Sequence, residues 1–108
     1  MVDQSLYLDR LFNSLADPTR RDILLRLITA RYTVSQLAEQ YDISFAGVAK
    51  HLTVLEKAKL IRKQKKGREQ VVSIAPQAVK DANYYLKQYE VLWNDRLSKI
   101  DAILKEGS

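Results

Sequence analysis

Basic side chains are concentrated in one short stretch of this sequence, residues 57–68, which holds seven lysines and arginines and no acidic residue. Ammonium and guanidinium groups at this density are suited to neutralising the phosphates of a nucleic acid backbone. The candidate phosphate contacts in this stretch are Lys57, Arg62, Lys63, Lys65, Lys66 and Arg68. The 108-residue chain has a formal net charge of +5, which is consistent with a polyanionic partner but is common among soluble proteins.

A second set of candidate contacts comes directly before this stretch. Val48, Leu52 and Leu55 recur at the spacing of one helix face, so residues 44–58 are predicted to form an amphipathic helix. A major groove is about 12 Å wide and accepts one helix, whose outward side chains meet base edges. An ordinary helical hairpin in a bundle would carry the same pattern. The residues expected to point outward are Phe45, Ala46, Ala49, Lys50, Thr53 and Lys57.

Two residues of this helix have alternative interpretations. Phe45 could contact a thymine methyl group, or pack against the preceding helix or the following hairpin. His51 is the only histidine and could contact a phosphate or make a structural hydrogen bond. Lys50 and Lys57 are the stronger candidates for phosphate contacts.

A short helix is predicted immediately before the outward-facing one. Thr33 is placed to cap residues 34–41, Asp42 tolerates turn conformations, and Ser44 is a favourable cap for the next helix. Many small proteins grip duplex DNA with two helices joined by such a tight turn. The side chains predicted to pack between the two helices are Leu37, Ala38, Ile43, Val48 and Leu52.

A hairpin is predicted next, with strands at residues 61–65 and 70–74 and Gly67 in the turn between them. Its basic residues could simply be solvated charges that prevent edge-to-edge association. Its position directly after a candidate recognition helix favours a wing that straddles the DNA backbone, with Lys66 or Arg68 reaching a minor groove.

Two further helices are predicted at the amino-terminal end. Residues 4–16 repeat apolar side chains at helical spacing. Asp17 and Pro18 favour the start of a second helix, which extends to Thr29. Its predicted buried residues are Ile23, Leu24, Leu27 and Ile28.

The last predicted helix extends from Pro76 to Lys105 and would be about 45 Å long at ~1.5 Å per residue. The rest of the chain is too small to cover it, so a partner helix is expected on its apolar seam. Its aromatic residues, such as Tyr84 and Tyr85, could line an effector pocket, although packing is the commoner use of such a cluster. The seam consists of Val79, Ala82, Leu86, Tyr89, Trp93, Leu97, Ile100 and Leu104.

Composition excludes several classes of protein. The absence of cysteine rules out disulfides and thiolate metal sites, and a single histidine makes a zinc or copper site difficult to build. No nucleophile–base pair or phosphate-binding glycine loop is evident, so no enzymatic activity, metal ion or cofactor is expected. No apolar run approaches the roughly 20 residues that span a membrane, and residues 1–5 are no signal peptide, so a cytoplasmic protein is expected.

Several fragments resemble one known family. Residues 15–24, LADPTRRDIL, resemble the LADPTRRxIL signature of ArsR-type winged helix-turn-helix regulators. Residues 34–38 and 43–55 resemble the VxxLA and SxxxVSKHLxVL core of that family, and Trp93 with Leu97 resembles its final helix. The resemblance implies one domain over residues 1–108, mainly helical with a small β-hairpin, in the order four helices, two strands and a fifth helix.

The resemblance also implies a homodimeric transcriptional repressor whose first and last helices pair across the dimer. The implied dimer residues are Leu8, Leu11, Phe12, Leu86, Tyr89, Trp93, Leu97, Ile100 and Leu104. The implied recognition residues are Ser44, Phe45, Ala46, Ala49, Lys50 and His51, and the wing matches Arg62 to Arg68. Metal sensors of the family carry cysteines on the third helix or histidine on the last helix, and this sequence has neither, so it resembles a metal-free member.

These observations together predict a regulator that binds an inverted-repeat DNA operator without sensing a metal. The alternative is a helical protein-interaction module that has lost operator recognition. Phe45, Ala46 and Gly47 keep this alternative open, because none of them can hydrogen-bond a base through its side chain.

Overall fold

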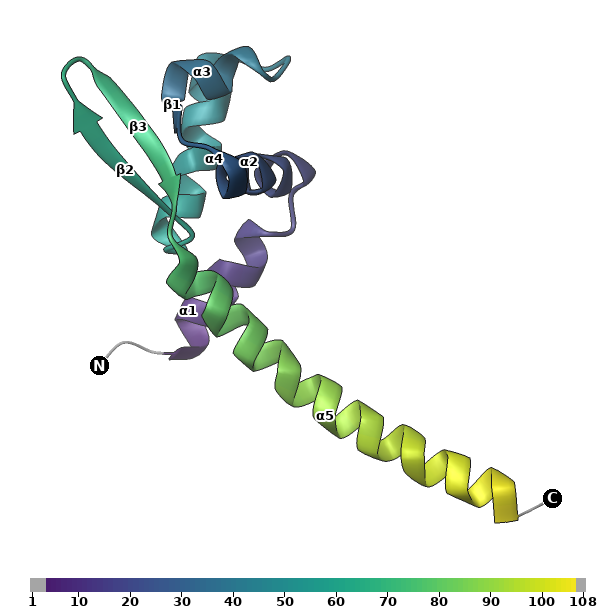
Figure 1. The fold of residues 1–108 in the computed structure, drawn as a ribbon. Coiled ribbons are helices and arrows are strands. Elements are labelled where there is room, and N and C mark those ends of the chain that lie inside the picture. Colours follow the sequence, from purple (N-terminus) through teal and green to yellow (C-terminus); the bar gives the residue numbers. More distant parts are fainter. Residues whose placement is uncertain (1–3, 107–108) are drawn as a thin grey trace.

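Five helices and three short strands make up the computed structural model, which describes residues 4–106 (Figure 1). This architecture confirms the predicted fold class. Two helices end earlier than predicted: the first stops at Ser14 instead of Ala16, and the third at Glu39 instead of Tyr41. The elements are α1 (Gln4–Ser14), α2 (Pro18–Thr29), β1 (Tyr32–Thr33), α3 (Val34–Glu39), α4 (Phe45–Lys57), β2 (Ile61–Lys66), β3 (Glu69–Ile74) and α5 (Pro76–Glu106).

The sheet has one more strand than the sequence predicts. Its strand order is β1-β3-β2, with both neighbours antiparallel to β3. The additional strand is only two residues long, and Tyr32 lies opposite Val72 in the register. A two-residue strand has no alternating pattern of its own, since it is defined by its pairing with β3.

The hairpin turn is tighter than predicted. Lys66 lies opposite Glu69, so only Gly67 and Arg68 form the loop. Gly67 has a φ of 63°, in the left-handed region that is accessible to glycine. A glycine with positive φ at the first central position is typical of a type II′ turn, whose twist matches that of the flanking strands.

Side-chain caps start the helices where the sequence predicts. The Asp17 carboxylate accepts a hydrogen bond from the Arg20 backbone N–H at 3.0 Å, at the start of α2. Thr33 and Gln36 form a reciprocal capping box at the start of α3. These caps satisfy N–H groups that the first helical turn leaves without an intrahelical partner.

The core lies where α2, α3 and α4 meet the sheet and the end of α1. The predicted burial of Ile28 is wrong, because Ile28 is 63% exposed. Ile43, predicted to pack between the two helices, lies beside Gly47 of α4 but is 44% exposed. Leu11 is fully buried within the protomer, so its predicted place in a dimer interface is also wrong. The fully buried apolar side chains include Leu11, Ile23, Leu37, Val48, Leu52, Leu55 and Val72.

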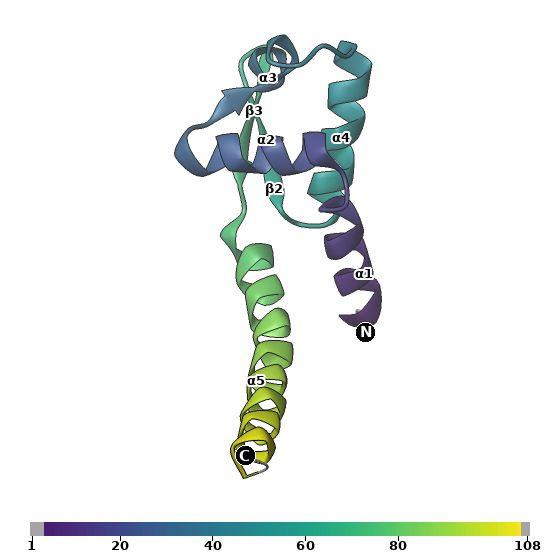
Figure 2. The ribbon, with the colours of Figure 1, turned by 90° about the vertical axis from the view of Figure 1, so that its right-hand side faces the viewer.

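The last helix leaves this winged head, meaning residues 15–75, and extends away from it (Figures 1 and 2). It has 31 residues, and only Ala78 and Ala82 in its first turns are buried. Helices α1 and α5 are joined by Tyr7 of α1, which donates a hydrogen bond to the Asp81 carboxylate of α5 at 2.7 Å. Burial and this bond raise the pKa of Tyr7 to about 12. No helix in the described part of the chain is long and apolar enough to cross a membrane.

Candidate nucleic acid interface

The candidate recognition helix α4 is held by its inner face and exposes its outer one. Val48, Leu52 and Leu55 are fully buried. Phe45, Ala46 and Lys50 are exposed at its amino-terminal end, as predicted. In both views this end of α4 and the hairpin lie on the side of the molecule opposite the end of α5 (Figures 1 and 2). Recognition helices commonly contact bases with their amino-terminal residues.

The first turn of α4 depends on a glycine that sequence analysis did not single out as structural. The Ser44 hydroxyl accepts a hydrogen bond from the Gly47 backbone N–H at 3.0 Å. A Cβ atom at Gly47 would lie 3.3 Å from that hydroxyl oxygen and 3.7 Å from Cδ1 of Ile43. The missing side chain therefore lets the cap and Ile43 close over the start of the helix.

Two other outward residues are placed differently from the rest. Thr53 is half-buried, and its hydroxyl donates to the Ala49 carbonyl at 3.0 Å within the same helix. Lys57 is the last residue of α4, which at ~1.5 Å per residue places it about 18 Å along the axis from Phe45. The predicted α4 contacts therefore cover the whole length of the helix.

The basic hairpin is a set of exposed cations with one exception. Arg62, Lys65, Lys66 and Arg68 are exposed, whereas the Lys63 side chain is only 19% exposed. The Lys63 ammonium lies 3.3 Å from the Glu56 carboxylate of α4. This ion pair joins the hairpin to the recognition helix and takes Lys63 out of the set of free charges.

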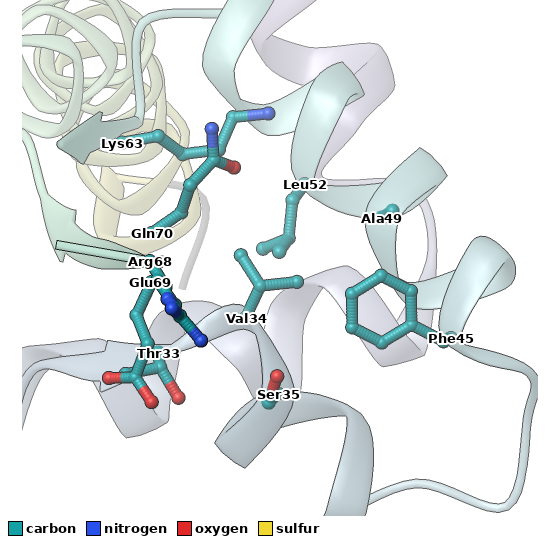
Figure 3. A pocket seen from close by; sticks show the side chains of 10 residues that line it. All are labelled: Thr33, Val34, Ser35, Phe45, Ala49, Leu52, Lys63, Arg68, Glu69 and Gln70. Atoms are coloured by element: carbon teal, nitrogen blue, oxygen red, sulfur yellow. The ribbon is translucent and has the colours of Figure 1, made fainter. Parts of the chain in front are cut away.

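A hollow of about 220 Å³ separates the hairpin from the starts of α3 and α4 (Figure 3). The Phe45 ring borders it with apolar neighbours, yet remains 57% exposed. One side of the ring is thus available for packing and the rest for a ligand, so both interpretations of Phe45 fit the geometry. The lining residues are Thr33, Val34, Ser35, Phe45, Ala49, Leu52, Lys63, Arg68, Glu69 and Gln70.

His51 makes the structural contact that was one of its two interpretations. Its Nδ1 atom lies 3.4 Å from Nη1 of Arg20 and 3.9 Å from the Asp17 carboxylate. The pKa of Asp17 is below its ordinary value, chiefly because the Arg20 backbone N–H donates to it, with the nearby His51 adding to the effect. A phosphate contact by His51 stays a prediction.

A polar network that the sequence analysis did not predict anchors the end of α3. The Tyr41 hydroxyl donates to the Asp22 carboxylate at 2.6 Å, and Arg26 donates to the same oxygen at 2.9 Å. Arg26 also lies 5.5 Å from the centre of the Tyr41 ring. Burial and the Asp22 bond raise the pKa of Tyr41 to about 12, while the Tyr41 and Arg26 bonds lower that of Asp22.

This network fixes the turn between α3 and α4 onto α2. The sequence contains half of its signal, because Asp22 and Arg26 are four residues apart on a predicted helix, a favourable spacing for an ion pair. The contact with Tyr41 spans 19 residues and has no local signature. Among residues 4–106, no group of three histidine, cysteine, aspartate or glutamate side chains could hold a metal ion.

Comparisons with known proteins agree with this geometry. Residues 15–64 match a family described as a helix-turn-helix domain. The transcriptional repressor SdpR of Bacillus subtilis is 35% identical over 60 residues, a match that spans 56% of this chain and 67% of SdpR.

Two solved structures are similar over a larger part of the chain. The crystal structure of an ArsR family transcriptional regulator is 34% identical, with a TM-score of 0.80 over 87% of this chain and 97% of that one. An ArsR-like transcriptional regulator from Rhodococcus sp. RHA1 is 29% identical, with a TM-score of 0.82 over 98% and 97% of the two chains. The second similarity includes the long helix α5, since it spans nearly the whole chain.

Proposed function

Because this chain belongs to the ArsR family of DNA-binding transcriptional regulators, we propose that it is a homodimeric repressor of an inverted-repeat operator. A repressor of this kind occupies its operator and blocks transcription. The repressor role is supported by the similarity to SdpR, which is itself a transcriptional repressor. The match spans about two thirds of SdpR, so what that protein binds is not transferred to this chain.

The observation that carries the proposal is the joint exposure of a capped helix end and a cationic hairpin on one side of the head. Phe45, Ala46 and Lys50 are exposed on α4, and Lys66 and Arg68 at the hairpin tip. A helix of this size fits a major groove, and exposed cations beside it neutralise phosphates. Most of the affinity is therefore expected to be electrostatic and to weaken steeply with salt.

The dimer is supported by the apolar side chains of α5. A monomer would expose a long apolar stripe to water, which is unfavourable unless another surface covers it. A second copy of the chain is the proposed cover, so that two recognition helices would lie about 34 Å apart, one turn of DNA. The exposed large residues of the predicted seam are Val79, Leu86, Tyr89, Trp93, Leu97, Ile100 and Leu104.

The proposed repressor acts without sensing a metal and without catalysis, in the cytoplasm where its operator lies. Support comes from the sequence, which has no cysteine to offer as a thiolate ligand and a single histidine to offer as an imidazole ligand. That histidine is already 3.4 Å from an arginine nitrogen.

Selection of bound fragments from a random duplex library tests the proposal. We expect inverted repeats whose half-sites are about 10–10.5 base pairs apart, centre to centre. Recovery of no preferred sequence would contradict operator binding and favour the protein-interaction alternative. Recovery of a single unrepeated site would contradict the dimer.

A further inference from the structure

One arginine joins three helices at the point where α1 ends and α2 begins. Nε of Arg20 donates to the Ser14 carbonyl at 2.6 Å, and Nη2 donates to the Asn13 carbonyl at 3.1 Å. Its third nitrogen, Nη1, lies 3.4 Å from Nδ1 of His51 in α4. The side chain therefore starts on α2, closes the last turn of α1 and reaches the recognition helix.

The backbone of Arg20 and the Ser14 carbonyl that it contacts are both held in place by other hydrogen bonds. The backbone N–H of Arg20 is fixed by its 3.0 Å hydrogen bond to Asp17. Ser14 is fully buried, and its hydroxyl donates to the Leu11 carbonyl at 2.6 Å. A guanidinium group is planar and presents its donors in a rigid fork, so its position between these partners is well defined.

Directional contacts of this kind differ from the apolar packing around them. Buried leucines such as Leu11 and Leu52 hold α1 and α4 together, but hydrophobic burial is non-directional and allows small sliding and rotation. Hydrogen bonds from one guanidinium to both helices restrict those movements, since their strength falls steeply with distance and angle.

We propose that Arg20 is a positioning residue, which fixes the recognition helix relative to α1 and thereby sets the half-site spacing that the dimer accepts. The inference rests on the proposed function, because it requires α1 and α5 to form the dimer frame. A dimer that reads two half-sites must hold its two recognition helices at a fixed separation. Looser attachment of α4 would widen the range of spacings that bind.

The neighbouring arginine provides a matched control. Arg21 donates from Nη1 to the Leu15 carbonyl at 2.8 Å and is exposed. It has the same chemistry and also contacts a carbonyl after α1, but the structure gives it no hydrogen bond to α4. Arg21→Gln therefore removes a charge and a carbonyl contact without touching the link to His51.

The test measures dissociation constants on four duplexes that carry the half-site recovered by selection. Three hold an inverted repeat, at the preferred spacing and at spacings shortened or lengthened by two base pairs, and one holds a single half-site. The ratio of the dissociation constants at shifted and preferred spacing defines the spacing preference. Wild type, Arg20→Gln and Arg21→Gln are compared, and Arg20→Lys keeps the charge but cannot reach the Ser14 carbonyl, the Asn13 carbonyl and Nδ1 of His51 at once.

For Arg20→Gln we expect the spacing preference to fall about tenfold, the scale of one lost hydrogen bond to a charged group, with single half-site affinity changed less than about twofold. Arg20→Lys should lose part of the preference, and Arg21→Gln none. If the glutamine variant does not fold, the lysine variant gives the same comparison. In a His51→Ala background, replacing Arg20 should have little further effect on the preference.

Three results would overturn the proposal. Arg20→Gln with an unchanged spacing preference would show that the arginine does not position α4. An equal loss of affinity on all four duplexes would show a purely structural role. A full further loss in the His51→Ala background would show that Arg20 does not act through His51. Wild type without any spacing preference would instead refute the dimeric operator on which the inference rests.

Discussion

The winged head and helix α5 both contain helices with a periodic apolar stripe, but the stripe is buried in the head and exposed in α5. In α4 the residues Val48, Leu52 and Leu55 are fully buried against the rest of the head. In α5 the residues Trp93 and Leu97 recur at similar spacing but are 60% and 43% exposed. A periodic stripe indicates that a helix face needs cover, but it does not say which chain supplies it. The stripe of α4 is covered within one protomer, whereas most of the α5 stripe is exposed there, and we propose that a second copy of the chain covers it.

The largest effect that would sharpen this contrast is expected from the core of the head. Leu52→Ala should lower the free energy of unfolding by about 2–5 kcal/mol, because it leaves a cavity in packed surroundings. Ile100→Ala in α5 should cost far less when the chain is dilute enough to be monomeric. Urea denaturation at matched concentrations measures both. Equal losses would mean that α5 belongs to the same folding unit as the head.

The next effect concerns the dimer itself. Trp93→Ala should raise the dimer dissociation constant roughly 30-fold, as expected for an aromatic residue central to an interface, and leave the helical circular dichroism spectrum unchanged. Tyr84→Ala on the same helix is a suitable control, since Tyr84 is 71% exposed but outside the seam. Sedimentation equilibrium distinguishes the two. A Trp93→Ala protein that stays fully dimeric at low micromolar concentration would refute the assigned interface.

A smaller effect on DNA affinity distinguishes the basic residues of the hairpin from those of α5. Replacing Lys65, Lys66 and Arg68 with alanine should weaken binding to all duplexes alike and flatten the salt dependence by about 0.9 logarithmic units per lost phosphate contact. The control replaces Lys80, Lys87 and Lys99 of α5, which removes the same number of charges away from the hairpin. Fluorescence anisotropy over a salt series gives both slopes. An equal change in the two variants would remove the hairpin from the DNA contact.

The smallest effect comes from the network that anchors α3. Hydrogen bonds from Tyr41 and Arg26 hold the pKa of Asp22 below its ordinary value of 3.8. The ionised carboxylate is therefore favoured by folding, so its contribution is present above that value and is lost as the pH falls through the lowered pKa. Asp22→Asn should reduce the loss of unfolding free energy at acid pH and leave the pH dependence above pH 5 unchanged. Urea denaturation over a pH series measures this dependence. An acid limb that matches wild type would show that this carboxylate contributes nothing.

Local patterns predicted most of the fold but not the partners of individual side chains. Caps at Asp17, Thr33 and Ser44 start helices as expected, because each acts on a backbone N–H three residues away. Strand β1 was missed, since a two-residue strand exists only by pairing with β3. The resemblance placed Leu11 in the dimer interface, but Leu11 is fully buried within the protomer, and only the tertiary fold shows which neighbours cover it.

In the candidate interface too, the sequence predicted the elements but not the partners of individual side chains. Charge density in the sequence identified the hairpin, but nothing in the sequence separated Lys63 from its basic neighbours as a residue with an acidic partner. The ion pair between Lys63 and Glu56 makes this distinction, and it depends on how β2 packs against α4. The role of Arg20 was also hidden, since its bonds to Asn13, Ser14 and His51 join segments that only the tertiary fold brings together.

The stoichiometry of the DNA complex tests the central claim most directly. Native mass spectrometry of the chain with a duplex recovered by selection should give a mass equal to two chains and one duplex. The same duplex cut to one half-site should bind far more weakly. The contradicting result is a complex of one chain per full-length duplex whose affinity equals that for the half-site duplex. It would show that two copies of the chain do not bind the operator together.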